Sequence, residues 1–153
     1  MCTASARARG TVADLDREKV RLSLPLMLAK HLAPKLNDGG SFVIFSGDSA
    51  FRIAVGMLAV AITNGAAETL TRSLAVELAP IRVNAISPGT IDTGAWDALG
   101  AEGKANHYEH VSETTPARRI GQSEDIAGAV LFCLTNSFLT GVTLKVDGDE
   151  ALV

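Results

Sequence analysis

The residues of this 153-residue chain that could do chemistry lie mostly just after short apolar runs. Ser46 follows one such run and Pro88-Gly89 follows another. Open α/β sheets bind ligands at the carboxyl ends of their strands, although a serine or a Pro-Gly pair is also typical of a simple turn. His107 and His110 could form half of a metal site. No third ligand is evident nearby in the sequence, so we interpret this segment as a polar loop face.

The elements that must position these residues alternate between strand and helix. Apolar runs predict buried strands at about 41–46, 81–87 and 142–147, and helical patterns cover about 16–36, 55–79 and 123–135. Connections longer than a dozen residues imply parallel pairing through right-handed crossovers. The sequence therefore predicts an α/β fold, a partial doubly wound sheet of three parallel strands with helices on both faces.

Finer expectations concern the helices and the loop between the second and third strands. The second helix carries an unbroken i,i+4 apolar stripe, formed by Leu58, Ile62, Ala66, Leu70, Leu74 and Leu78. Ser123 is the expected N-cap of the last helix. Residues 90–116 show weak periodicity, and we interpret them as a loop with one or two short helices.

Composition excludes several classes of function. The net charge is −3 and the basic residues are dispersed, which argues against nucleic acid as a partner. The longest apolar stretch is far shorter than the ~20 residues that span a bilayer, so no membrane partner is expected. Two cysteines without a CxxC motif indicate reduced thiols in a cytoplasmic protein. Residues 1–15 are expected to be an unstructured lead-in.

Four stretches of the sequence closely resemble the short-chain dehydrogenase/reductase family. They read GGSFVIFSG, GAAETLTRSLAVELAPIRVNAISPGTIDT, PARRIGQSEDIAGAVLFCLTNS and FLTGVTLKVDGD. In that family a doubly wound, Rossmann-like sheet of seven strands binds NAD or NADP together with a small alcohol or carbonyl substrate. The resemblance implies that residues 16–153 correspond to the C-terminal half of such a domain, and that the chain is N-terminally incomplete.

The same resemblance implies roles for individual residues. The loop that contacts the nicotinamide corresponds to Pro88, Gly89, Ile91 and Thr93. Ser46 falls near the serine that binds the substrate oxygen, with a turn or cap role as the alternative. Lys19 falls near a catalytic asparagine and could be a substitute acid, with a solvated surface lysine as the alternative.

The family's acid–base pair, Tyr-x-x-x-Lys, is missing. Our alignment of Gly65-Ala66-Ala67 with the family's Lys-Ala-Ala puts Ala61 at the tyrosine position and Gly65 at the lysine position. Neither side chain can exchange a proton. No glycine-rich phosphate-binding turn is evident either. We therefore expect dehydrogenase activity to be absent or very weak.

Two interpretations follow. The first is an NAD(P)-dependent short-chain oxidoreductase type that is inactive or nearly so as given. The second is a non-enzymatic, self-associating module, or a gene fragment, that retains the family's oligomer surface. Both predict a homo-oligomer. The strand at 41–45 should be an edge strand, because the strands expected to flank it would precede this sequence.

Overall fold

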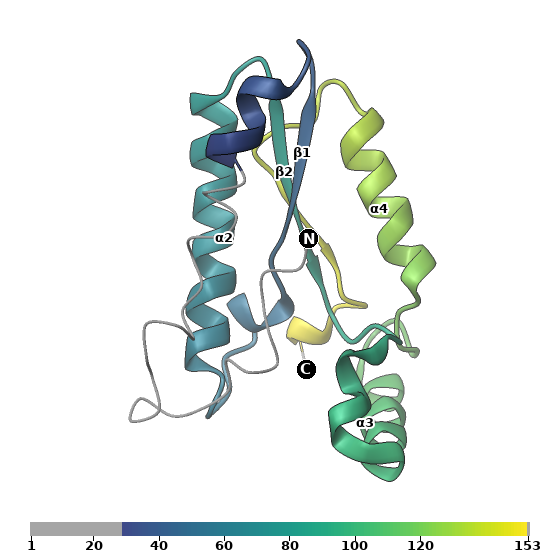
Figure 1. Cartoon of the computed structure of the whole chain (residues 1–153). Helices are drawn as coiled ribbons and strands as arrows, with labels where there is room; N and C mark the ends of the chain where they lie inside the picture. The colour runs from purple at the N-terminus through teal and green to yellow at the C-terminus, as the bar shows by residue number, and fades with distance from the viewer. Residues whose placement is uncertain (1–28, 153) are drawn as a thin grey trace.

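Three short runs rich in apolar residues pair into a parallel sheet at the centre of the molecule (Figure 1). The computed structural model describes residues 29–152. Strands β1 (Ser41–Phe45), β2 (Arg82–Pro88) and β3 (Thr143–Val146) lie in the order β1-β2-β3. Both pairings are parallel. The predicted strands and their order are confirmed to within one or two residues.

The middle strand, β2, forms the core of the sheet. Val83, Ala85 and Ile86 have no exposed surface, because β2 has a strand on each side and a helix over each face. The buried cluster continues into Ile44 of β1. Among the described residues β1 pairs only with β2, so it is an edge strand as predicted.

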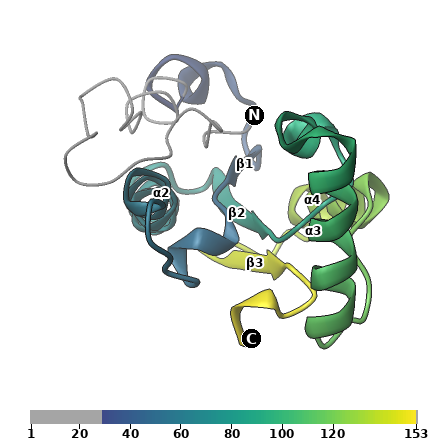
Figure 2. The same ribbon diagram turned by 90° about the horizontal axis from the view of Figure 1, so that it is seen from below.

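Two helices cover the two faces of the sheet. Helix α2 (Leu58–Glu77) lies on one face and helix α4 (Ser123–Thr135) on the other. The view along the strands in Figure 2 shows the three layers, with the sheet between the helices. This confirms the predicted arrangement of helices on both faces.

The predicted apolar stripe of α2 is only partly the face that packs on the sheet. Leu74 is buried, but Leu58 and Ile62 are exposed at the other end of the helix. A strict i,i+4 row turns by roughly 40° at each step, because the helix has 3.6 residues per turn. Over five steps such a row leaves the buried face. Apart from Leu74, the side chains that are buried on this helix are smaller than leucine: Ala59, Val60, Thr63, Asn64, Ala67 and Thr71.

The start of α4 also differs from the prediction by one residue. The N-cap is Gln122, and Ser123 is the first helical residue. The Gln122 side chain and the Asp125 carboxylate form a reciprocal capping box. Asp125 also accepts two hydrogen bonds from Arg119, at 2.7 and 2.8 Å. These contacts with Arg119 and the Gln122 N–H hold the pKa of Asp125 at about 2.

The segment between β2 and α4 contains more helix than expected. A 3-10 helix η5 (Gly94–Leu99) leads into α3 (Gly100–Thr114), which has 15 residues. The interpretation as a loop with only short helices was wrong for α3. Its signal was weak because Val111 is its one buried residue, so its sequence carries no apolar stripe. Both helices lie beyond the carboxyl ends of the strands (Figure 1).

Some predictions fall outside the described residues. They are the lead-in at 1–15, Lys19 and most of the helix at 16–36. Residues 29–32 are helical, and a 3-10 helix η3 (Ala33–Lys35) follows them. Within the described part of the chain, no helix combines the length and hydropathy needed to cross a membrane.

Arg82, the first residue of β2, binds the C-terminal end of α4. One guanidinium nitrogen donates to the carbonyl oxygens of Cys133 and Asn136 at 2.8 and 2.7 Å. The other donates to the carbonyl of Leu134 at 2.8 Å. The last carbonyls of a helix have no partners within the helix, so this arginine satisfies them and fixes α4 on the sheet.

We expect Arg82→Ala to lower the free energy of unfolding by about 2 kcal/mol, because charge-assisted hydrogen bonds to the helix end are lost. Urea denaturation followed by circular dichroism measures this. Arg72→Ala is the matched control: Arg72 is exposed and donates only to Thr69, at 3.3 Å, so its loss should change stability by less than about 0.5 kcal/mol. Equal effects of the two substitutions would contradict this role for Arg82.

Candidate functional site

A pocket of about 490 Å³ opens at the carboxyl ends of β1 and β2. Its walls come from four segments: the turn after β1, the first half of α2, the loop after β2 and the start of α4. The lining is mostly apolar and consists of Phe45, Ser46, Gly47, Asp48, Ser49, Met57, Val60, Asn64, Pro88, Gly89, Ile91, Thr93, Ala95, Trp96, Ser123 and Ile126. Five of the six predicted site residues therefore line one cavity.

Ser46 is buried at the floor of this pocket. Its Oγ lies 3.1 Å from the main-chain oxygen of Asn64 and 3.4 Å from Oε1 of Glu68. Burial raises the pKa of the Glu68 carboxyl, and the Ser46 hydroxyl partly offsets this. Ser46 thus belongs to the pocket lining, with its hydroxyl directed at helix α2.

Asn64 presents a side-chain amide to the same wall. Its Nδ2 donates to Ser49 Oγ at 2.7 Å, and its Oδ1 is buried without a hydrogen-bond partner among the described residues. A Cβ at Gly47 would lie 2.7 Å from this Nδ2, so the amide fits there because residue 47 is glycine. An orphaned buried acceptor beside a cavity is the kind of group that a ligand satisfies.

The structure corrects the positions that we assigned to the missing acid–base pair. Neither Ala61 nor Gly65 is in the pocket lining, whereas Val60 and Asn64 are. The latter two are also four residues apart and so lie on the same side of α2. The alignment was displaced by one residue. The chemical conclusion is unchanged, because an isopropyl group and a neutral amide cannot act as an acid–base pair near pH 7.

The loop after β2 forms the opposite wall. Thr93 is the N-cap of η5 and accepts a hydrogen bond from the N–H of Ala95 at 3.3 Å. Trp96 donates its indole N–H to the carbonyl of Ile91 at 3.1 Å, which fixes the ring at the pocket wall. Pro88 and Gly89 form the base of this loop. The four residues predicted to contact the nicotinamide thus lie in one loop, which these hydrogen bonds hold.

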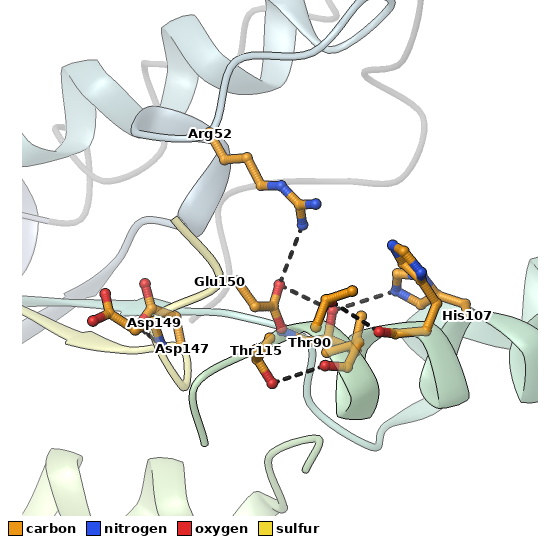
Figure 3. Close-up of polar contacts among 10 residues, drawn as sticks. Arg52, Thr90, His107, Thr115, Asp147, Asp149 and Glu150 are labelled. Atoms are coloured by element: carbon orange, nitrogen blue, oxygen red, sulfur yellow. Dashed lines mark hydrogen bonds and ion pairs between the residues drawn. The ribbon is translucent and has the colours of Figure 1, made fainter. Parts of the chain in front are cut away.

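A buried carboxylate at the end of the described chain holds this loop in place (Figure 3). Glu150 accepts hydrogen bonds from the Thr90 N–H at 2.7 Å and from the Thr90 hydroxyl at 3.2 Å. Arg52, in the segment after β1, lies 3.9 Å from the same carboxylate. His107 of α3 lies 3.3 Å from the Thr90 hydroxyl. Thr90 and Glu150 together therefore join four segments of the chain.

The prediction of a polar loop face at His107 was wrong, because His107 lies on helix α3, its ring stacks on Trp96 at 4.3 Å between centroids, and it contacts Thr90. Among residues 29–152, no group of three or more His, Cys, Asp or Glu side chains is arranged to hold a metal ion.

Sequence reasoning missed several residues of the site. Asp48 directly follows the strand-end turn, and that position was the available signal. Val60 and Asn64 would have been found by placing the small residues of α2, rather than its leucines, against the sheet. Nothing in the local sequence marks Glu150, since its role depends on a contact with a residue 60 positions away.

Comparisons with known proteins agree with this geometry. Residues 5–148 match the family described as enoyl-(acyl carrier protein) reductase. The chain is 35% identical over 140 residues to a short-chain dehydrogenase/reductase of Acremonium sp, covering 90% of this chain and 53% of the relative. It is 34% identical over 151 residues to dehydrogenase/reductase SDR family member 4 of Homo sapiens, covering 91% and 54%. The chain thus spans about half the length of these relatives.

Solved structures show the same fold. A small-chain dehydrogenase in complex with NADPH superposes with a TM-score of 0.88 at 35% identity, over 95% of this chain and 69% of that one. Aldohexose dehydrogenase of Thermoplasma acidophilum gives a TM-score of 0.84 at 26% identity, over 95% of this chain and 64% of that one.

Two glycines of the site region should respond oppositely to alanine. A Cβ at Gly89 would lie 2.7 Å from the Asp147 Cα, a backbone atom, so Gly89→Ala should cost about 1–3 kcal/mol of stability. A Cβ at Gly65 would meet nothing within 4 Å, so Gly65→Ala should stabilise α2 by about 0.5–1 kcal/mol. Chemical denaturation of both variants measures the two changes. The same sign for both would contradict the close approach of Gly89 to Asp147.

Proposed function

The chain belongs to the short-chain dehydrogenase/reductase family, and on that basis we propose that its pocket is the nicotinamide and substrate end of an NAD(P)-dependent oxidoreductase site. The observation that carries the proposal is the gathering of Ser46 with Pro88, Gly89, Ile91 and Thr93 around one cavity. These segments are more than 40 residues apart in the sequence, and the parallel sheet brings them together at one edge.

The residues present fit the nicotinamide end of NAD or NADP. Pro88 and Ile91 offer apolar surface to a flat ring, and the Thr93 hydroxyl can donate to a carboxamide oxygen while it accepts from Ala95. The buried Asn64 Oδ1 is an unused acceptor on the opposite wall. When bound, the reduced cofactor supplies a hydride; the residues of this chain orient the ring and exclude water.

The fit to the rest of a dinucleotide is poorer. No lysine or arginine is among the pocket-lining residues, and no glycine-rich turn leads into a helix within residues 29–152. We therefore propose weak binding of NAD or NADP by this chain, through nicotinamide contacts.

The lining also indicates the class of substrate. Met57, Val60, Trp96 and Ile126 give the pocket an apolar interior, with hydroxyls confined to a few positions. A small apolar ketone or its alcohol fits this lining better than a charged metabolite, because a buried charge without a partner is costly.

Turnover by this site should be slow. Hydride addition to a carbonyl needs a proton donor at the oxygen, and general acid catalysis contributes about 10²–10⁴-fold to rate. The side of the pocket formed by α2 carries Val60 and Asn64, so the family's tyrosine, the usual proton donor, is absent from it. We propose carbonyl reduction below about 1 s⁻¹, under the median of ordinary enzymes.

A self-associating module is the second candidate function, supported by an apolar surface on α4 and just beyond it. The exposed side chains there are Leu131, Phe132, Leu134 and Phe138, with Phe138 fully exposed. Large exposed apolar groups on one helix are typical of a protein interface. We also propose a cytoplasmic protein, because Cys133 is a buried free thiol.

Installing the missing pair tests the oxidoreductase proposal. We expect Val60→Tyr with Asn64→Lys to raise NADPH-dependent reduction of acetophenone by about 100-fold, because both side chains would enter the pocket. Ala61→Tyr with Gly65→Lys is the matched control and should give no increase. Circular dichroism checks that each variant is folded. If the variant with Asn64→Lys does not fold, Val60→Tyr alone is used for the same measurement. A larger gain in the control pair would contradict the site.

Light scattering tests the second candidate. We expect the chain to be at least dimeric at micromolar concentration, and Phe132→Asp to shift it toward monomer, because a charge cannot be buried in an apolar interface. Val76→Asp, a change at a more exposed position on α2, is the control and should leave the mass unchanged. A strictly monomeric parent chain would remove the self-association proposal.

A further inference from the structure

One acidic side chain lines the pocket, and the comparisons assign it no role. Asp48 is the first residue of the 3-10 helix η4 (Asp48–Ala50), directly after Gly47. It lies between Ser46 and Ser49 in the sequence, and both of these serines are buried in the same wall. Asp48 itself is partly exposed to the cavity. Within residues 29–152, no other carboxyl group belongs to the pocket lining.

The surroundings of Asp48, its burial and the nearby charges, favour the protonated form of its carboxyl group. Burial is the largest cause, and the negative charge of Glu150 adds to it, with a smaller contribution from Asp147. The N–H of Ser49 and the guanidinium of Arg52 act in the opposite direction. Together these raise the pKa of Asp48 to about 6.

Two further charged side chains belong to elements beside η4. Glu68 on α2 is directed at the Ser46 hydroxyl. Lys145 on β3 lies with its Nζ 3.8 Å from the centroid of the Phe51 ring. Neither contributes to the electrostatics of Asp48 as strongly as Glu150, Arg52 and Asp147 do. The charged groups that act on Asp48 are therefore two acidic side chains, Glu150 and Asp147, and one cationic side chain, Arg52.

We propose that Asp48 is the proton donor to a carbonyl oxygen bound in this pocket, acting from the β1 side where the family's tyrosine would act from the helix. The inference rests on the proposed function and deepens it. The Arg52 ion pair engages Glu150, 3.9 Å away, so it does not remove Asp48 from the cavity.

The chemical step balances as follows. A reduced nicotinamide, when bound, would supply the hydride that the carbonyl carbon accepts, and the π pair of the C=O bond would pass to the oxygen. That oxygen takes the proton of the Asp48 carboxyl, which gives an alcohol and an Asp48 carboxylate. Solvent then returns a proton to Asp48. The nicotinamide is oxidised by two electrons and the carbonyl is reduced by two.

The expected pH dependence has a definite sign. The protonated form of Asp48 predominates below pH 6 and falls to about 1% at pH 8. A ketone oxygen can accept a hydrogen bond only from the protonated form, whereas the carboxylate would repel it. Ketone affinity and turnover should both therefore decline as the pH rises through 6.

The experiment uses acetophenone as the probe and fluorescence of Trp96, the only tryptophan of the chain and a lining residue, as the binding readout. For the parent chain we expect the apparent Kd to rise at least tenfold from pH 5 to pH 8. Asp48→Asn keeps a neutral hydrogen-bond donor but no acidic proton. It should bind acetophenone independently of pH, while NADPH-dependent turnover falls about 100-fold. Glu150→Gln should shift the pH midpoint of binding to lower pH.

Asp38→Asn, at an exposed position outside the pocket, is the control and should leave the pH profile unchanged. If Asp48→Asn does not fold, a carboxyl ¹³C NMR titration of the parent chain, with and without acetophenone, replaces it. Acetophenone should raise the pKa of Asp48. Binding that is independent of pH, or an Asp48 pKa that acetophenone does not move, overturns the role of Asp48 alone. No binding at pH 5 overturns the proposed function as well.

Discussion

The buried contact between Glu150 and Thr90 determines the shape of the pocket. A carboxylate that is nearly inaccessible to water accepts both the main-chain N–H and the hydroxyl of Thr90, 60 residues earlier in the chain. A buried carboxylate needs such partners, since it cannot keep its hydration. The loop after β2 cannot move without breaking them. Because Pro88, Ile91 and Thr93 lie on that loop, the wall of the pocket is set from outside the pocket.

The parallel sheet supplies the second constraint. β1 and β2 end at the same edge, so the turn after one and the loop after the other face each other across the cavity. Gly89 permits the close approach to Asp147 that brings the end of β3 underneath, and the Glu150 segment follows directly from there. The order of the strands, the close approach at Gly89 and the contact made by Glu150 therefore together define the site.

The sequence was sufficient for the strands, because runs such as Ser41–Phe45 are short, apolar and bounded by turns. Ser46 and the Pro88–Thr93 loop, singled out by their position after strands and by the family resemblance, do line the pocket. The sequence did not predict features that depend on the rotation of a helix about its axis or on contacts between residues far apart in the chain. The i,i+4 row of leucines misidentified the buried face of α2. Separately, the match of Gly65-Ala66-Ala67 to Lys-Ala-Ala put the expected acid–base pair at Ala61 and Gly65, which lie outside the pocket lining. Glu150 has no local signal at all.

The corrected face of α2 changes where proton chemistry can occur. Val60 and Asn64 make the helix wall of the pocket neutral, and the Ser46 hydroxyl is engaged by the Asn64 carbonyl and Glu68. On the opposite wall, the Trp96 N–H is bound to Ile91. The proposed proton donor, Asp48, lies instead in the turn after β1. Burial raises the pKa of the Asp48 carboxyl in that turn, and the nearby Glu150 carboxylate that fixes the loop raises it further. One buried charge thereby links the shape of the pocket to its acidity.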